Sequence, residues 1–447
     1  MKNRGSKHTL TIGLMLFALF LGAGNMIFPT ALGQAAGSNV IGATIGFLIT
    51  GVGLPLLGVT AIAISGGNLR SIANRVHPIF GIIFTIILYL AIGPFFGIPR
   101  TGTVAFEIGV TPFLPKSVDS NGFSLFIYTI IFFAITYWLS LNPTKLVDRI
   151  GKILTPLLII VLALLVGRVF ISPMGDISKP QAAYQSSPFF KGFIEGYLTL
   201  DALAALVFGI VVINAIKDKG INNQREITIT TIKAGAFAAI GLMLVYVSLA
   251  YLGATSIDVI GPVLNGGQIL SEAATYYYKS IGTVILGIAI TFACLTTSIG
   301  LVSACSEFFN NIFPTFTYST YVGIFSTFSM LVANVGLTQL IAISVPILMI
   351  IYPIAISLMF LTFLDKFFNG EQFVYIGGVV GAAVISILEG FKAAGILSTN
   401  LNELLNTALP FYSVGVGWLI PFIIGSIIGY FIKYIFEKSN LKDYTKA

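Results

Sequence analysis

The first stretch able to hold a ligand is Gly-Ala-Gly-Asn at residues 22–25, which interrupts an apolar run over residues 10–32. Glycine frees the backbone, and Pro29 removes a hydrogen-bond donor and clashes with the preceding turn, so we expect a helix here to break near the membrane midplane. N–H groups freed at such a break can hold a carboxylate, and freed carbonyl groups can hold a sodium ion. The alternative is an unbroken glycine-rich helix that packs closely against a neighbour.

The second feature is an acidic side chain within an apolar segment, because Asp201 lies within residues 196–209. A carboxylate is costly inside a membrane span and is expected to face a cavity or a partner. Thr199 can satisfy backbone groups that a break would free. Asp201 can pair with the ammonium group of a substrate, pair with a coupling cation, or carry a proton. The alternative places Asp201 at the membrane interface, where water solvates it.

Two adjacent hydroxyl side chains, Thr296 and Thr297, follow Ala293 in a third apolar segment. Hard cations prefer oxygen ligands. Two hydroxyls and a carbonyl from this helix, facing carbonyls freed at the first break, would make a five-oxygen sodium site. The common alternative is that such hydroxyls bond back to carbonyl groups of their own helix.

Arg100 and Glu107 are seven residues apart, which places them on one face of a helix. They are expected to pair with each other or with lipid headgroups, or else to form a gate or contact a substrate. Aromatic side chains can line an apolar pocket for an isobutyl-sized group, although most of the 37 phenylalanines are expected to pack elsewhere. The aromatic candidates are Tyr89, Phe95, Phe96 and Phe208.

The composition indicates that membrane-spanning helices position these residues. Hydrophobic residues make up 56% of the 447-residue chain and charged residues only 9%, whereas soluble domains carry about 25% charged residues. The apolar runs are about 20 residues long and continuous, which favours helices over a β-barrel. With two histidines and no H-E-x-x-H, G-x-S-x-G or P-loop motif, the chain is not predicted to be an enzyme.

Hydropathy predicts an all-α protein with about twelve spans in a single transmembrane domain over residues 1–447. The spans are expected at residues 9–32, 39–65, 78–107, 123–140, 150–171, 193–216, 228–253, 281–306, 318–334, 338–362, 373–392 and 410–436. Residues 254–280 are expected to form a re-entrant or surface helix. Interruptions in the first and sixth spans, at corresponding positions of two five-helix halves, are typical of a transporter site. We therefore expect repeats at about 9–171 and 193–362, with additional helices at about 373–436.

Most lysine and arginine residues lie in the segments on one side of the predicted spans, and this is the side on which the N-terminus lies. By the positive-inside rule this side faces the cytoplasm, and an even number of spans places both termini there. The net charge of +7 is explained in this way without a nucleic-acid partner.

Three stretches of the sequence together resemble one family. They read Phe-Leu-Gly-Ala-Gly-Asn-Met-Ile-Phe-Pro at residues 20–29, Gly-Pro-Phe-Phe-Gly-Ile-Pro-Arg-Thr at residues 93–101, and Gly-Tyr-Leu-Thr-Leu-Asp-Ala-Leu-Ala at residues 196–204. They resemble the branched-chain amino acid carriers of bacteria, the leucine–isoleucine–valine cation symporters of the BrnQ type. The resemblance covers essentially the whole chain.

The resemblance implies the LeuT-type fold of two inverted five-helix repeats with broken first and sixth helices. It also implies a sodium site, because residues 22–25 match the Gly-x-Gly-Asn break of that fold and residues 293–297 match its Ala-x-Leu-Thr-Ser/Thr run. The implied ligands are the carbonyls of Ala18, Leu21 and Ala293 and the hydroxyls of Thr296 and Thr297. One residue fewer separates Asn25 from Pro29 than in the sodium/amino acid symporter pattern, and the arginine found there is absent, so the outer gate must be built differently.

The family resemblance implies a secondary symporter in the bacterial cell membrane that imports leucine, isoleucine and valine with sodium by alternating access. The substrate carboxylate would lie on the N–H groups freed at residues 22–25, and its ammonium group would meet carbonyls of the first and sixth spans. The expected substrate-binding residues are Phe20, Gly22, Ala23, Gly24, Asn25, Phe95, Thr199 and Asp201. The alternatives are proton coupling and another small neutral solute on the same fold. Beyond the lipid bilayer, no obligatory protein partner is expected.

Overall fold

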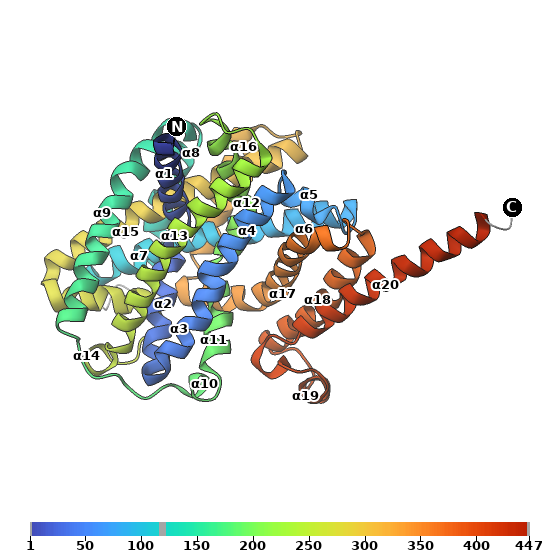
Figure 1. Ribbon diagram of the computed structural model, residues 1–447. Helices are drawn as coiled ribbons and strands as arrows, with labels where there is room; N and C mark the ends of the chain where they lie inside the picture. Colours follow the sequence, from blue (N-terminus) through green and yellow to red (C-terminus); the bar gives the residue numbers. More distant parts are fainter. Residues whose placement is uncertain (1, 116–121, 445–447) are drawn as a thin grey trace.

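The computed structural model describes residues 2–115 and 122–444, which are almost entirely helical and contain no β-strand within those ranges. Figure 1 shows helices that cross one another in a bundle, with the C-terminal helix projecting from it. The two ends of the predicted domain, residues 1 and 447, lie outside the described ranges. The prediction of an all-α protein is confirmed.

The twelve predicted spans coincide with helices or with consecutive pairs of helices. In chain order they are α1 (Lys2–Phe20) with α2 (Ala23–Ala36), α3 (Val40–Leu48) with α4 (Leu54–Ser65), α6 (Pro78–Leu90) with α7 (Gly97–Gly109), α8 (Phe123–Ser140), α9 (Pro143–Ile171), α11 (Pro188–Glu195) with α12 (Asp201–Lys217), α13 (Gln224–Ala254), α15 (Gly266–Ile312), α16 (Tyr318–Ala333), α17 (Leu337–Leu364), α18 (Gln372–Ala393) and α20 (Leu419–Tyr444). The short helices in the connections are α5 (Leu69–Ala73), α10 (Ala182–Gln185), α14 (Ile257–Ile260) and α19 (Thr399–Ala408).

Length and composition alone identify seven of the described helices as able to cross a membrane, or eight if the bent pair Pro188–Thr199 and Asp201–Lys217 is one span. Shorter apolar helices of 10–17 residues supply the rest of the predicted spans. These shorter helices are Thr9–Phe20, Pro156–Ile171, Tyr318–Ala333 and Leu419–Ile432. The chain is therefore a multi-pass membrane protein.

The segment predicted as a re-entrant or surface helix, residues 254–280, is divided between two helices. The short helix α14 occupies its first part, and α15 begins at Gly266 and continues through a kink at Lys279 (φ 55°) into the eighth span. Asn265 caps the start of α15, because its side chain accepts two backbone hydrogen bonds from the first turn. The eighth span is thus longer than hydropathy indicated.

Two pairs of spans pack along their whole length in the same pattern. The first span packs on the seventh, because α1 and α2 both contact α13, and the sixth packs on the second, because α11 contacts α3 and α12 contacts α4. Glycines bring these helices together; a Cβ atom added at Gly33 of α2 would lie 1.9 Å from the Ala250 carbonyl oxygen of α13. In a five-helix repeat, span six corresponds to span one and span seven to span two. The two contacts are therefore equivalent, which supports two related five-helix halves. The repeat boundaries at residues 9–171 and 193–362 stay predictions.

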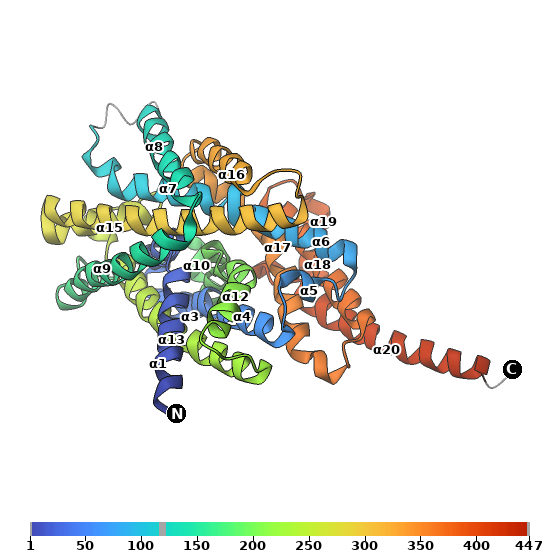
Figure 2. The ribbon, with the colours of Figure 1, turned by 90° about the horizontal axis from the view of Figure 1, so that it is seen from above.

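The eleventh and twelfth spans lie at one side of the bundle. Helix α18 contacts both α17 and α20. Figures 1 and 2 both show α20 reaching away from the other helices toward the C-terminus. The additional helices are therefore attached to the repeats mainly through α17.

Gly46 is a position where the second span cannot accept a side chain, because a Cβ atom there would lie 1.9 Å from the Phe189 carbonyl oxygen of α11. We expect Gly46→Ala to lower the stability by about 1–3 kcal/mol, since it would force α3 and α11 apart. The apparent unfolding temperature of the purified protein measures this effect. Gly300→Ala is the matched control, because among the described residues no atom outside the neighbouring turns of its own helix lies within 4 Å of a Cβ atom at that glycine. Equal unfolding temperatures for the two variants would contradict the prediction.

Candidate functional site

The first span is broken where α1 gives way to α2. Helix α1 ends at Phe20 and α2 begins at Ala23, while Gly22 between them is extended (φ −107°, ψ −168°). The N–H group of Gly22 donates to Oδ1 of Asn25 at 3.1 Å. The predicted break is therefore confirmed, although Pro29 lies inside α2 and does not end the helix.

The sixth span is broken between α11 and α12, which are joined by the 3-10 turn η6 (Gly196–Thr199) and enclose a bend of 43°. Leu200 ends the turn in the left-handed region (φ 66°), which costs a non-glycine residue about 1–2 kcal/mol. The hydroxyl of Thr199 donates to the Gly196 carbonyl oxygen at 2.9 Å and accepts the N–H of Asp201 at 3.3 Å. Thr199 thus satisfies backbone groups at the break, as predicted.

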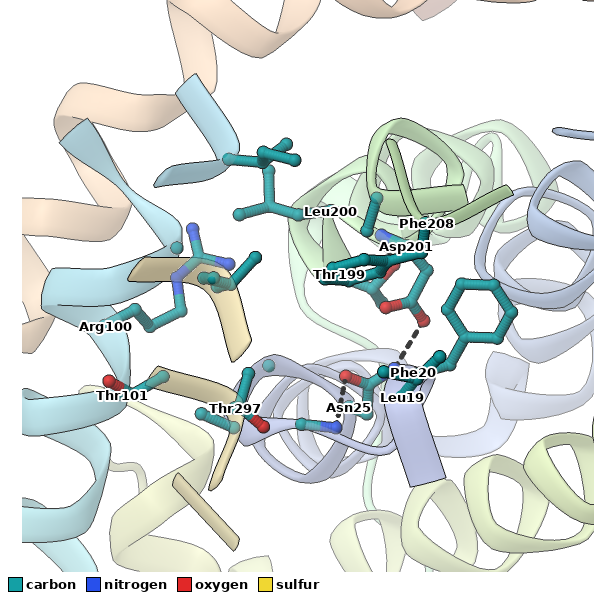
Figure 3. A pocket seen from close by; sticks show the side chains of 17 residues that line it. Leu19, Phe20, Asn25, Arg100, Thr101, Thr199, Leu200, Asp201, Phe208 and Thr297 are labelled. Carbon is teal, nitrogen blue, oxygen red and sulfur yellow. Dashed lines mark hydrogen bonds between the residues drawn. The ribbon is translucent and has the colours of Figure 1, made fainter. Parts of the chain in front are cut away.

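Asp201 is the first residue of α12 and is held between three spans. It is only 4% exposed. The hydroxyl of Tyr246 in α13 donates to its Oδ2 at 2.9 Å. Nδ2 of Asn25 donates to the same oxygen, as Figure 3 shows. Asn25 also donates to the Tyr246 hydroxyl, so the two breaks and the seventh span share one network. The alternative in which water solvates Asp201 at the membrane interface is therefore wrong.

These residues surround a cavity of about 50 Å³. The predicted site residues that line it are Phe20, Gly22, Ala23, Gly24, Asn25, Thr199, Asp201 and Thr297, together with the aromatic candidate Phe208. The lining residues that were not assigned to the site are Leu19, Ile92, Gly97, Arg100, Thr101, Leu200, Ala204 and Leu301 (Figure 3). Pockets that bury small ligands have volumes of roughly 300–1,000 Å³. The surrounding helices must therefore separate to admit a molecule as large as an amino acid.

Phe95 does not reach the cavity, which corrects its assignment to the substrate-binding residues. Its side chain is 41% exposed and packs against Phe328, with 5.4 Å between the ring centroids, in an apolar groove beside the ninth and tenth spans. The π-helical turn η3 (Ala91–Phe95) contains the non-helical residue Gly93 (φ −89°, ψ −117°), and this turn leaves Ile92 rather than Phe95 at the cavity. The other aromatic candidates that are not part of the cavity lining are Tyr89 and Phe96.

Arg100 and Glu107 do not pair, which corrects the expectation of a structural ion pair. Both lie on α7, and seven residues of helix extend about 10.5 Å, which is beyond hydrogen-bond reach. Glu107 accepts instead from Nδ2 of Asn265 at 3.2 Å and from Nε2 of Gln268 at 2.9 Å. Glu107 therefore fastens α7 to the start of α15.

The Arg100 guanidinium lies in the cavity wall and is 2% exposed. It donates to the Leu198 carbonyl oxygen in η6 and to Oγ of Ser344 in α17 at 3.5 Å. The Cζ atom of Arg100 lies 5.0 Å from the centroid of the Phe28 ring. The Nε atom has no hydrogen-bond partner among the described residues. A cation in one wall and the Asp201 carboxylate in another suit a ligand that carries both charges (Figure 3).

Of the predicted sodium ligands, Thr297 lies where the first break faces α15, because a Cβ atom added at Gly22 would lie 3.6 Å from its Oγ1 atom. The hydroxyls of Thr296 and Thr297 donate to the Ala293 carbonyl oxygen at 2.8 and 3.0 Å, which is the back-bonded alternative. Each hydroxyl oxygen retains acceptor capacity, and oxygen is the ligand type that a hard cation prefers. The other predicted ligands lie in the last turn of α1 and at the break, and they are Ala18 and Leu21.

Sequence reasoning missed Tyr246, which completes the network around Asp201. The residue lies within the uninterrupted helix α13, and no proline or charged residue lies within five positions of it. It also forms an edge-on ring contact with Phe47, with 5.4 Å between the centroids. Only the packing of α13 against the first and sixth spans brings its hydroxyl to the site.

The fold, with two broken spans that meet at a buried cavity, defines a membrane transporter of the LeuT type. Solved structures with a similar fold include Mhp1, a nucleobase-cation-symport-1 family transporter, with a TM-score of 0.58 and 13% identity, over 96% of this chain and 93% of that chain. Another is MhsT in complex with L-phenylalanine, with a TM-score of 0.51 and 13% identity, over 95% of this chain and 98% of that chain.

The chain belongs to the branched-chain amino acid transport protein family, whose model matches residues 5–436. Similar curated proteins include the branched-chain amino acid permease BraB of Bacillus subtilis, which is 53% identical over 95% of each chain. They also include the branched-chain amino acid permease BrnQ of Escherichia coli, which is 40% identical over 94% of each chain. The family, the fold and the identification as a transport protein rather than an enzyme are thereby confirmed.

Proposed function

We propose that this protein is a secondary symporter of the bacterial cell membrane that imports leucine, isoleucine and valine with sodium, and that both termini face the cytoplasm. The observation that carries the proposal is the meeting of the two helix breaks at one cavity. There Asn25 from one break binds Asp201 from the other, and Arg100 lies in the wall. Relatives named as branched-chain amino acid permeases support the substrate class.

The two charges of an amino acid would be divided between opposite walls of the cavity. The Asp201 carboxylate would face the ammonium group, and carbonyls freed at the breaks would complete its contacts. The substrate carboxylate would lie on the N–H groups of residues 22–25, near the positive Arg100 guanidinium. The apolar side chains available to a branched substrate are Phe20, Leu200 and Phe208. Because the hydrogen bond between Asn25 and Asp201 joins the two breaks across the cavity, we expect it to open as the substrate enters.

A sodium ion would be held by the carbonyls of Ala18, Leu21 and Ala293 and the hydroxyls of Thr296 and Thr297. The bound ion would supply the coupling to the sodium gradient that drives uptake. These five groups come from the first span and from α15, so together they would hold the first break against the eighth span. The N–H groups of residues 22–25 would then be fixed for the substrate, and substrate binding would strengthen sodium binding by the same factor.

Thr297→Ala is expected to raise the sodium concentration for half-maximal leucine uptake at least about tenfold, because it removes one of the five oxygen ligands. A sodium titration of uptake into proteoliposomes measures this shift, and Thr297→Ser is expected to restore the wild-type value. Thr231→Ala is the matched control, since the Thr231 hydroxyl donates to the Ile227 carbonyl oxygen at 2.9 Å in the same back-bonded manner, within α13. Equal effects of the two alanine variants would remove Thr297 from the sodium site.

Uptake of radiolabelled leucine under an imposed sodium gradient, compared with an equal proton gradient, tests the proposed function. Sodium-driven uptake that excess isoleucine and valine inhibit is the expected result. Valine, which has one methylene fewer than leucine and isoleucine, is expected to be taken up less well by at most about 200-fold, because one methylene is worth about 1–3 kcal/mol in an apolar pocket. Leucine uptake that is absent under both gradients would overturn the substrate class.

Proton coupling is the second candidate, and the burial of Asp201 is the observation that favours it. The carboxylate lies at the contact between the two breaks, so gain or loss of a proton there would change the contact directly. Proton-driven uptake that is indifferent to Thr297→Ala would support this candidate over sodium coupling.

A further inference from the structure

A separate cavity of about 420 Å³ lies between α11, α17, α18 and the turn η8 (Tyr412–Val414), and we refer to it as the α11–α18 cavity. Its volume lies within the roughly 300–1,000 Å³ of pockets that bury small ligands. The short helices that contact two of these elements, α10 and α19, lie at the end of the molecule opposite the N-terminus in Figure 1. The cavity is therefore near one face of the bundle, away from the N-terminus.

One wall of the α11–α18 cavity carries a buried carboxylate. Glu389 of α18 lines the cavity and is 1% exposed. Its Oε1 accepts the N–H of Gly417 at 2.8 Å, whereas its Oε2 has no hydrogen-bond partner among the described residues. Burying a carboxylate oxygen without a partner is costly. Because protein atoms cover Oε2, the ammonium group of a ligand in the cavity would supply the missing donor once the carboxylate turns toward it.

A lysine lies three residues further along α18, on the same face of the helix. The Nζ atom of Lys392 donates to the Tyr412 carbonyl oxygen at 3.4 Å and lies 4.5 Å from the centroid of the Tyr412 ring. An ammonium group has three donors, so Lys392 retains capacity for a carboxylate. The other lysine in the wall, Lys191, is paired with Glu195 at 3.2 Å. Glu389 and Lys392 attract each other across one turn of α18, but no ion pair within 4 Å joins them among the described residues, so one charge of each sign can turn to a ligand.

Most of the remaining wall is apolar. The large apolar side chains come from α11, α17 and η8, and they are Phe190, Ile194, Val345, Met349 and Val414. Gly415 (φ 79°) lets the chain after η8 approach them, because a Cβ atom there would lie 3.2 Å from Cε of Met349. An aliphatic side chain placed among these groups would be removed from water, which favours binding.

We propose that the α11–α18 cavity is a second binding site for a zwitterionic molecule with an aliphatic side chain, namely an α-amino acid of the transported class. Its carboxylate would bind Lys392 and its ammonium group would bind Glu389. The identity of the ligand as an amino acid rests on the proposed function, whereas the charge pattern of the cavity does not. A zwitterionic lipid headgroup has the same pair of charges, and leucine binding measured with and without phosphatidylethanolamine separates the two sources.

Occupation of this cavity would act on the central site through α11. That helix forms one wall of the cavity and continues through η6 to Leu200 and Asp201 at the sixth-span break. The position of α11 is therefore shared by the two sites. A ligand that holds α11 against α17 and α18 would change the affinity of the central site, and the central ligand would change the affinity of this one equally.

Equilibrium binding of radiolabelled leucine to the full-length protein in phosphatidylglycerol nanodiscs tests the proposal. We expect two leucines to bind to each wild-type chain. Lys392→Gln and Glu389→Gln are each expected to weaken leucine binding at the α11–α18 cavity at least about tenfold. Lys366→Gln is the matched control, because Lys366 is an exposed lysine in the turn after α17, and this variant is expected to keep both. Asp201→Asn is expected to weaken the leucine in the central cavity directly, and to change the affinity of the α11–α18 cavity only through the coupling between the two sites.

The outcomes separate the inference from the proposed function. One leucine per wild-type chain, with an affinity that Lys392→Gln leaves unchanged, would overturn the second site and leave the proposed function intact. Loss of the second leucine when phosphatidylethanolamine is added to the nanodiscs would assign the cavity to a lipid headgroup and overturn the amino-acid site. Absence of any leucine binding to the wild type would overturn both proposals.

Tryptophan fluorescence gives a readout that does not depend on the folding of Asp201→Asn. The chain has two tryptophans, of which Trp138 is 69% exposed and Trp418 is 2% exposed. Trp418 follows Gly417, whose N–H is bound to Glu389. In Trp138→Phe we expect leucine to change the Trp418 emission. When Lys392→Gln is added to this variant, we expect the leucine concentration that gives half of the change to rise at least about tenfold. Identical titrations for the two proteins would overturn the second site.

Discussion

Asp201→Asn is expected to reduce sodium-driven leucine uptake at least about thirtyfold. The substitution keeps the size of the side chain and an acceptor oxygen for Tyr246, but it removes the charge that would face the substrate ammonium group. Truncating one partner of a buried, hydrogen-bonded charge pair costs about 2–5 kcal/mol. Since each 1.4 kcal/mol is about tenfold in an equilibrium constant, the lower limit corresponds to about thirtyfold. Initial rates of uptake into proteoliposomes, at several leucine concentrations, measure the effect.

Asp218→Asn is the matched control for this variant, because Asp218 follows the C-terminal end of the same helix and is exposed. It is expected to take up leucine at the wild-type rate. The exchange of leucine at equal concentrations across the membrane separates two roles for Asp201. Loss of exchange indicates that Asp201 binds the substrate, whereas exchange without accumulation indicates that it carries the coupling proton. Uptake by Asp201→Asn at the rate of Asp218→Asn would contradict both roles.

Arg100→Gln is expected to weaken leucine binding at least about tenfold and to lower the unfolding temperature. The guanidinium faces the same cavity as Asp201 and donates to the Leu198 carbonyl oxygen of the sixth-span break. Leaving a buried acceptor unpaired costs about 1–3 kcal/mol, and the charge that would attract the substrate carboxylate is lost as well. Arg100→Lys keeps the charge but not the planar fork of donors, so we expect intermediate binding.

Arg168→Gln provides the control for Arg100→Gln, because Arg168 is an exposed arginine in the last turn of α9. It is expected to leave both leucine affinity and unfolding temperature unchanged. If Arg100→Gln lowers the unfolding temperature but leaves the leucine affinity at the wild-type value, Arg100 only holds the break in place. Binding and thermal unfolding must therefore be measured on the same preparation.

The two helix breaks could be predicted from the sequence because their causes are local. At the first break the side chain of Asn25 accepts the N–H of Gly22 three residues earlier, and in the sixth span Thr199, three residues after Gly196, caps the groups freed at the break. The spans could be predicted for the same reason, since hydropathy adds up along a continuous segment. Asp201 was recognised because a carboxylate within an apolar segment needs a partner, but the sequence did not name that partner.

Only the tertiary structure decided which way the helices turn and what they meet. Tyr246 reaches Asp201 across 45 residues of sequence because α13 packs along the first span and reaches the sixth-span break. The π-helical turn in the third span leaves Phe95 outside the cavity, and Arg100 on the following helix lies in its wall. Rotation about a helix axis and the choice of neighbouring helices depend on contacts between distant segments, so no local pattern contains them. The sequence was therefore sufficient to predict the two breaks and the polar residues beside them. The arrangement of these residues around one cavity is decided by the packing of the spans.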